Sequence, residues 1–277
     1  MDKPAGPTSH DVVARVRRAL QTRSVGHAGT LDPFATGLLV VLVGRATRLA
    51  RFVEQQDKTY WGEAVLGVTT DTDDGTGAVL AEMVPAAWPE LEEIQRALAS
   101  LAGTQLQRPP AYSARRVAGE RGYRLARAGK PVDLPATTVT VSRLDLLAWA
   151  APVVTFRAVV SAGTYVRALA RDLGERLGMG AHLRALRRER IGGLRVEDAV
   201  PLEQLNPGTP VLPPLAVLGH LARVPLTDAE AGLVRHGRPV AAPEARGFGA
   251  MLVEGRLVAV AEGGHGEWQP RVVLEPA

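Results

Sequence analysis

The sequence contains no cysteine, only three lysines against thirty arginines, and few aromatic residues. Without cysteine the chain can form no disulfide, no thiolate nucleophile and no cysteine-ligated zinc or iron–sulfur site. Its six histidines show no H-x-x-x-H spacing, so the residues give little support to a histidine metal site either. We therefore expect no bound metal, and because no nucleotide-binding loop occurs in the sequence we expect no organic cofactor either.

Long apolar runs are also missing. No stretch of about 18 uncharged apolar residues occurs, and the N-terminus lacks the basic, apolar and small-residue sections of a signal peptide. The 277 residues, 46% of them hydrophobic, are enough for one large domain followed by a small one. These features predict a soluble, cytoplasmic protein with a sizeable core.

The basic residues are unevenly distributed along the chain. Residues 201–277 hold six arginines and eight acids, which leaves 27 basic and 21 acidic residues in 1–200. The stretch 104–130 has seven basic residues and one glutamate, and 164–195 has eight arginines and three acids. Because guanidinium groups suit phosphates and stacked bases, the two stretches together favour a polyanionic partner. Each stretch alone is as readily explained as a solvated surface.

Hydrophobic spacing predicts alternating helices and strands over the first 200 residues. The 3.6-residue period predicts a helix over 9–20 with Ser9 as N-cap, a helix over 89–102, and a third between Gly163 and Gly178. Strand patterns occur at 36–43, 57–69, 135–147 and 152–161.

Two further segments have a distinct local pattern. The apolar run 36–43 is uninterrupted, which is typical of a strand covered on both faces. The acidic DTDDGTG at 71–77 has Thr76 where a calcium-binding loop has its glycine, and no glutamate closes the loop. We therefore expect a turn there.

A second region begins after residue 200. Six prolines between 201 and 225 interrupt the periodicity and indicate a linker or domain boundary. Beyond them, short strands are expected around 250–253, 256–261 and 271–274, separated by glycine turns. This pattern predicts a small β module at the C-terminal end.

The segment GHAGTLDPFATG, residues 26–37, contains the first candidate for a catalytic group. Pro33 favours an extended backbone at Asp32, and the small residues before it allow close approach, so the carboxylate is held at an open surface. An aspartate that only caps a helix or forms a turn is the alternative.

Further candidates are Tyr60, Tyr165, Arg167 and His27. For the tyrosines the alternative is a structural place in the core, and for His27 it is an ordinary loop position. Arg167 lies in the first turn of its predicted helix, where the dipole disfavours a cation, so it requires an acidic partner. If that partner is Asp32, the pair keeps the carboxylate ionised and orients it.

Four segments resemble the signature regions of the TruB-type bacterial tRNA pseudouridine(55) synthases. They are MDKPAG (1–6), VGHAGTLDPFATGLL (25–39), DKTYWGEAVLG (57–67) and GTYVRALARDLG (163–174), in the family's order and with fitting separations. The resemblance covers nearly the whole chain. Within it, 109–129 resembles the family's RNA-gripping insertion and 222–277 resembles a PUA module.

The resemblance implies an α/β fold with two domains. A catalytic domain over 1–221 would contain a mixed, mostly antiparallel central sheet flanked by helices, with an insertion at about 104–134. A PUA-like, β-barrel-like RNA-binding domain would follow over 222–277.

The resemblance also implies roles for single residues. Asp32 matches the catalytic aspartate, Tyr60 the active-site tyrosine that stacks on the target base, and Arg167 the arginine paired with the aspartate.

Five substrate-binding positions are implied in the same way. His27 matches a histidine placed near the flipped-out nucleotides, and Tyr165 and Leu186 match pocket positions. Lys3 and Pro4 match the N-terminal motif that buttresses the site.

The implied function is isomerisation of uridine to pseudouridine at position 55 in the T-arm of tRNA, by a monomer without guide RNA and away from membranes. Two alternatives remain open at this point. The chain could be a non-catalytic RNA binder or tRNA folding chaperone, or the catalytic subunit of a guide-RNA-dependent complex. The insertion at 104–134 favours the solitary enzyme.

Overall fold

The computed structural model describes residues 1–113, 116–117, 120–121 and 134–275 of the chain. Its largest element is an eight-stranded sheet in which β14 (Leu194–Arg195) is added beside β13. The order of the other strands is β1 (Asp2–Lys3), β3 (Thr36–Leu38), β13 (Ala181–Ile191), β5 (Lys58–Leu66), β12 (Val153–Val160), β11 (Thr137–Ala150) and β8 (Gly103–Gln107). Neighbours are antiparallel except β3 and β13, so the mixed, mostly antiparallel sheet is confirmed.

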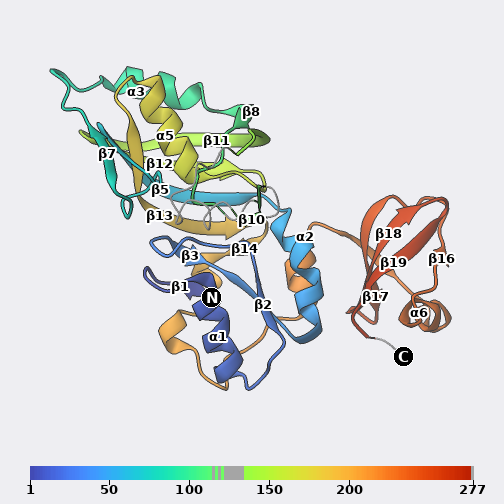
Figure 1. Ribbon diagram of the computed structural model, residues 1–277. Coiled ribbons are helices and arrows are strands. Elements are labelled where there is room, and N and C mark those ends of the chain that lie inside the picture. The colour runs from blue at the N-terminus through green and yellow to red at the C-terminus, as the bar shows by residue number, and fades with distance from the viewer. Residues whose placement is uncertain (114–115, 118–119, 122–133, 276–277) are drawn as a thin grey trace.

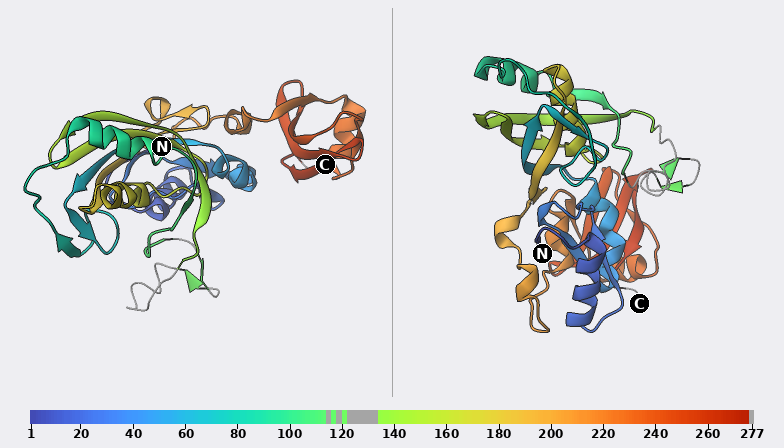
Figure 2. Two further views of the ribbon diagram at one scale, coloured as in Figure 1. Left: turned by 90° about the horizontal axis from the view of Figure 1, so that it is seen from above. Right: turned by 60° about the vertical axis from the view of Figure 1, so that its left-hand side comes forward.

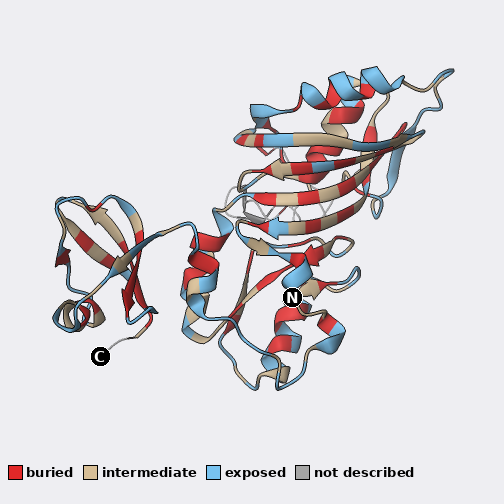
Figure 3. Ribbon diagram, turned by 180° about the vertical axis from the view of Figure 1, so that it is seen from behind, coloured by how far each residue is buried: buried red, intermediate tan, exposed pale blue. Residues whose placement is uncertain are grey.

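Strand β5 lies in the middle of this sheet, between β13 and β12. Its buried and half-buried residues alternate strictly, as the period-2 pattern of 57–69 predicts, and Lys58 and Tyr60 share the buried face. Figure 3 shows the same alternation along the neighbouring strands. Strands β11 and β12 confirm the predictions for 135–147 and 152–161, whereas the arginine-rich strand β13 was not anticipated.

Two helices pack on the sheet, α3 (Leu91–Ala99) against β11 and α5 (Val166–Arg176) against β13 (Figure 1). Their apolar stripes are buried and their other faces are exposed, because the sequence repeats apolar residues every three to four positions. Both helix predictions are confirmed. No helix in the described part of the chain has the length and apolar character needed to cross a bilayer.

A smaller layer lies beyond the end of the sheet that β1 and β3 form (Figure 1). It consists of α1 (Ser9–Ala19), the antiparallel pair β2 (Val25–Ala28) and β4 (Val40–Val43), the 3-10 helix η1 (Gly44–Leu49) and α2 (Ala50–Glu54). Helix α1 and η1 both pack against β2. This layer brings the segment 26–37 against the sheet.

Two local predictions in this layer are wrong. Thr8, not Ser9, is the N-cap of α1, because Thr8 and Asp11 form a reciprocal capping box that leaves Ser9 free for another contact. The run 36–43 is not one strand. The chain leaves the large sheet after Leu38 and pairs with β2 from Val40, so β3 and β4 belong to different sheets.

Two short strand pairs lie outside these two layers. Strands β6 (Val68–Thr70) and β7 (Val79–Glu82) pair antiparallel around the acidic segment 71–77, which is a turn as expected. Strands β9 (Arg116–Val117) and β10 (Glu120–Arg121) form a second pair. Most of the expected insertion at 104–134 beyond residue 113 lies outside the described residues.

The C-terminal part is a separate curled sheet (Figure 2). Its strand order is β15 (Ala222–Pro225), β17 (Gly247–Val253), β18 (Arg256–Gly264), β19 (Glu267–Val273) and β16 (Val240–Ala241), accompanied by α6 (Asp228–Arg235). The three expected strands are present but longer than the sequence pattern suggested. The connecting segment contains the 3-10 helices η2 (Val196–Asp198), η3 (Leu202–Gln204) and η4 (Pro214–Leu218).

This module contacts the smaller layer directly. Arg45 and Arg48 of η1 donate hydrogen bonds to the carbonyl oxygens of Leu274 and Val273. The rings of Phe52 and Phe248 meet edge to face, with centroids 5.2 Å apart. The module is therefore docked on η1 and α2.

Candidate active site

Asp32 lies in the loop between β2 and β3, and the residues on both sides of it are anchored. The buried Ser9 hydroxyl donates to the Leu31 carbonyl oxygen at 3.1 Å and accepts from the Leu31 N–H at 2.9 Å. Lys3 Nζ donates to the Pro33 carbonyl oxygen at 3.2 Å. The backbone thus fixes where the Asp32 side chain begins.

Asp32 borders a cavity of about 300 Å³. Its walls come from segments far apart in the sequence: the loop after β2, strands β5 and β13, the segment after β8, and the N-terminal end of α5. The side chains around it include those of Asp32, Lys58, Tyr60, Tyr112, Tyr165, Arg167, Leu186 and Arg188. The structure therefore brings five of the eight candidate residues to one cavity.

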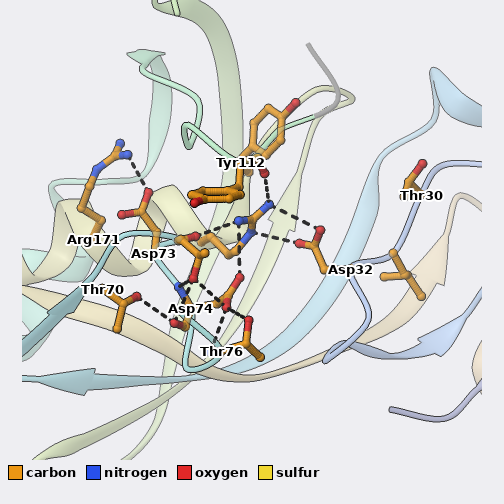
Figure 4. Close-up of polar contacts among 12 residues, drawn as sticks. Thr30, Asp32, Thr70, Asp73, Asp74, Thr76, Tyr112 and Arg171 are labelled. Carbon is orange, nitrogen blue, oxygen red and sulfur yellow. Dashed lines mark hydrogen bonds and ion pairs between the residues drawn. The ribbon is translucent and has the colours of Figure 1, made fainter. Parts of the chain in front are cut away.

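The expected pairing of Arg167 with Asp32 is present (Figure 4). Arg167 Nε lies 2.9 Å from Asp32 Oδ2 as an ion pair without an aligned hydrogen bond, and Nη2 donates to Oδ1 at 3.4 Å. The same guanidinium group donates to the carbonyl oxygens of Thr72 and Tyr112 at 2.7 and 2.8 Å. These contacts hold a side chain that is only 5% exposed, so the cation cannot swing away from Asp32.

Asp74 is a second acidic partner of Arg167 that the sequence did not reveal. Its Oδ2 lies 3.4 Å from Arg167 Nη1, while Oδ1 accepts hydrogen bonds from the hydroxyls of Thr72 and Thr76. In Figure 4, Asp74 and Thr76 lie in the acidic turn below Asp32. A run of acids and threonines at 71–77 predicts only a turn, because nothing local indicates that an arginine on α5 packs against it.

Opposing influences act on the Asp32 carboxyl. Burial raises its pKa above the ordinary value, Arg167 opposes that rise, and the like charge of Asp74 adds to it. The net direction is upward, although the side chain is 37% exposed towards the cavity. Arg167 therefore favours the ionised form against a site that otherwise disfavours charge.

Tyr60, Tyr165 and Leu186 line the same cavity as Asp32, as expected for pocket residues. Tyr60 is 8% exposed on the cavity-facing side of β5, and Leu186 is 7% exposed on β13. Tyr165 is the N-cap residue of α5, and the buried Gln107 side chain bonds both its N–H and its carbonyl oxygen. Two tyrosines and a leucine give the cavity apolar and aromatic walls.

Two buried cations complete the cavity wall and were not anticipated. Lys58 lies two residues before Tyr60 on the same face of β5, and burial together with the charge of Arg188 lowers its pKa to about 8. Arg188 is 1% exposed and donates to the carbonyl oxygens of Gly29, Thr30 and Leu38, so it braces the Asp32 loop from β13. The sequence did contain one signal for Lys58: it lies two residues from Tyr60 on a predicted strand, which places both side chains on the same face.

His27, Lys3 and Pro4 do not line the cavity. His27 is half-buried on β2, its Nδ1 has no hydrogen-bond partner in the described structure, and burial lowers its pKa. Lys3 is fully buried and donates to the Pro4 and Pro33 carbonyl oxygens, and burial lowers its pKa to about 8. Lys3 therefore supports the Asp32 loop from behind, whereas the exposed Pro4 contributes only the carbonyl oxygen that holds the Lys3 ammonium group.

The arginine-rich stretch 164–195 is not the free cationic surface that its composition suggested. Arg184 pairs with Glu63 and Arg187 with Asp2, each at 2.7 Å, and Arg188 is buried. These acids lie on strands or chain segments distant in sequence, so a local charge count could not reveal them.

Comparison with known proteins identifies the family. The model described as TruB family pseudouridylate synthase (N terminal domain) matches residues 17–166, and that described as tRNA pseudouridylate synthase B C-terminal domain matches 167–208. The chain belongs to the TruB family of pseudouridylate synthases. As a TruB-family protein it is a pseudouridine synthase, an isomerase, so the predicted family and enzyme class are confirmed.

TruB-family relatives match over the full length. The tRNA pseudouridine synthase B of Thermobifida fusca (strain YX) is 45% identical over 284 residues, covering 99% of this chain and 97% of that protein. That of Mycobacterium sp. (strain KMS) is 44% identical over 291 residues, covering 100% and 95%. A solved Cbf5-Nop10-Gar1 complex contains a chain with the same fold, with a TM-score of 0.76, 28% identity, and coverage of 99% of this chain and 84% of that one.

Proposed function

We propose that this TruB-family enzyme isomerises uridine to pseudouridine at position 55 in the T-arm of tRNA. The relatives named tRNA pseudouridine synthase B support the choice of tRNA, and the resemblance of the four motifs supports position 55. The observation that carries the proposal is the Asp32 carboxylate, paired with Arg167 beside a cavity of about 300 Å³. That volume lies at the lower end of the range of about 300–1,000 Å³ for ligand pockets.

The reaction moves one bond within a nucleotide. The bond between ribose C1′ and uracil N1 breaks, the uracil rotates, and C1′ bonds to C5; the proton leaves C5 and N1 gains one. No group is imported and nothing is oxidised, so a carboxylate, a proton acceptor and an enclosing cavity suffice. Asp32 acts on the ribose, either by attacking C1′ or by taking the C2′ proton.

The target base has to leave its stack before Asp32 can reach the ribose. Extrusion costs a few kcal/mol. Stacking on an aromatic ring such as Tyr60 returns about 1–3 kcal/mol. Leu186 and Tyr165 then exclude water from the extruded base, which strengthens the interaction between Asp32 and Arg167.

The Asp32→Asn variant tests this function. We expect it to bind tRNA nearly as tightly as the wild type and to form no pseudouridine, because the amide keeps the shape of the side chain and loses its negative charge. Asp198→Asn, at an exposed position, is the matched control and should retain full activity. Pseudouridine in a tRNA transcript is measured by mass spectrometry, and full activity of Asp32→Asn would overturn the proposal.

The enzyme is proposed to act as a monomer without guide RNA. The Cbf5-Nop10-Gar1 complex has a chain of the same fold, so a guided assembly is the competing reading. The purified protein should modify an isolated T-arm hairpin. A requirement for added RNA or partner proteins would favour the guided assembly.

A tRNA folding chaperone activity is a second candidate function. The docked C-terminal module, which resembles a PUA domain, gives the chain RNA-binding surface beyond the cavity. If this activity exists, Asp32→Asn should still accelerate the refolding of a misfolded tRNA. The two activities can coexist, and this measurement separates them.

A further inference from the structure

A basic groove lies at the C-terminal end of α1, apart from the cavity. It has a volume of about 590 Å³ and is lined by Arg17, Arg18, Gln21, Thr22 and Arg23. All but the half-buried Thr22 are exposed. Its lining therefore offers guanidinium, amide and hydroxyl groups and no carboxylate.

The backbone folds these residues around the groove. After α1 the Gln21 N–H bonds the Arg18 carbonyl oxygen at 3.4 Å and the Thr22 N–H bonds the Arg17 carbonyl oxygen at 3.1 Å, which is a Schellman motif. Gln21 takes the left-handed position of this motif, with φ +49°, where glycine is the usual residue. The turn sends Arg23 back beside the last turn of the helix, and Arg17 Nη2 is fixed on the Val25 carbonyl oxygen at 2.9 Å.

The charges around the groove are unbalanced. Residues 12–53 contain seven arginines and one acid, and that acid is Asp32 in the cavity. Within the described residues, none of the groove arginines lies within ion-pair distance of a carboxylate. Most arginines of 164–195 are paired with acids or buried, whereas the described arginines that line this groove have no carboxylate partner.

Helix α1 connects the groove to the catalytic loop. Its first residue, Ser9, bonds Leu31 beside Asp32, and its last turn forms one wall of the groove. Figure 1 shows α1 directed away from the large sheet. Eleven residues at about 1.5 Å each place the groove roughly 16 Å from the catalytic loop along the helix. An RNA with one nucleotide in the cavity can therefore reach the groove only with another part of its backbone.

We propose that this groove binds phosphodiester groups of the substrate RNA at a distance from the target nucleotide. The inference rests on the proposed function, because the cavity must hold the target uridine. Guanidinium forks bind phosphate oxygens through paired hydrogen bonds, and the Gln21 amide and Thr22 hydroxyl add further donors. The groove increases RNA affinity without reading the base sequence.

The double variant Arg18→Gln with Arg23→Gln tests the groove. Each lost phosphate contact reduces the slope of log affinity against log salt by about 0.9, so two contacts reduce it by about 1.8. Over a fourfold rise in salt, the wild type should lose about 12-fold more affinity for tRNA than the variant. The control is Arg96→Gln with Arg176→Gln, which removes two exposed arginines on α3 and α5 and should leave the slope unchanged.

Further measurements make the outcome decisive. At saturating tRNA the single-turnover rate of the double variant should equal that of the wild type, and this equality also verifies that the variant is folded. The single variant Arg23→Gln should give half the change in the salt slope. If the double variant binds tRNA with unchanged affinity and unchanged salt slope, the proposal is wrong. The proposal is also wrong if the double variant loses binding of inorganic phosphate but keeps its binding of tRNA, because the groove would then be a site for free phosphate. If the wild type forms no pseudouridine while the salt effect remains, the proposed function fails and the groove stands.

Discussion

Replacing Arg167 by methionine tests how the ion pair at the cavity works. The guanidinium group contacts Asp32, Asp74 and the carbonyl oxygens of Thr72 and Tyr112, and methionine removes all of these contacts. Removing one partner of a buried ion pair costs about 3–5 kcal/mol. Because Asp32 is 37% exposed to the cavity, we expect the lower end, a loss of about 3 kcal/mol in the free energy of unfolding.

The same substitution shifts the pH dependence of the reaction. In the proposed reaction Asp32 acts in its ionised form, so we expect activity above its folded-state pKa and a loss of activity as the pH falls through it. Burial already raises this pKa, and Arg167 is the largest influence that lowers it. Without Arg167 the pKa rises further, by one unit for each 1.4 kcal/mol or so of lost interaction. The acid limb of the rate profile should move to higher pH.

Arg167→Lys is the matched control because it keeps the charge and loses the planar fork. A compact ammonium group cannot reach Asp32 and both carbonyl oxygens together. We expect an acid limb close to that of the wild type and a rate about 100-fold lower at every pH, since the carboxylate loses its orientation. Single-turnover pseudouridine formation from about pH 5 to 9 measures both effects. A methionine variant with the wild-type rate and acid limb would refute this account of the pair.

Two other substitutions test buried groups around the cavity. Gly37→Ala should destabilise the fold by more than about 3 kcal/mol, since Gly37 has φ +101° and an added Cβ would lie 2.3 Å from the Arg188 carbonyl oxygen; a near-neutral urea unfolding curve would contradict this. Lys58→Met should change how stability depends on pH. The pKa of Lys58 is lowered from 10.5 to about 8 on folding, so the unfolded chain binds more protons between these values and wild-type stability gains from Lys58 as the pH rises. The variant lacks this gain, so the urea midpoints of wild type and Lys58→Met should move apart between about pH 8 and 10. A difference between the two midpoints that stays constant over this range would contradict the prediction.

The candidate site was predictable where a residue carries its own local signal. Asp32 precedes a proline among small residues, and Arg167 is a cation in a first helical turn, where it needs an acid. The match to family motifs assigned roles to the candidates Tyr60 and Tyr165 and added Leu186, and the structure lines the same cavity with all five. Lys58 had a weaker signal, the two-residue spacing from Tyr60 on one strand face.

The remaining features depend on contacts between distant segments. Asp74 approaches Arg167 only because the turn between β6 and β7 folds under α5. Arg188 looked like part of a cationic surface and is buried against the loop that carries Asp32. Local charge counts therefore pointed to 104–130 and 164–195, whereas among the described residues the arginines that line the groove at the end of α1 are the ones left without a carboxylate partner in a common pocket.

Taken by itself, the sequence determined helices α1, α3 and α5, the long strands β5, β11 and β12, the three central strands of the C-terminal sheet, the family and the acid at position 32. It could do so because periodicity and motif spacing act within a few residues of one another. Only the tertiary structure decided which charges are paired, which are buried, and where the run 36–43 divides between two sheets. Those outcomes depend on burial and on distances across the fold, and the order of residues along the chain records neither.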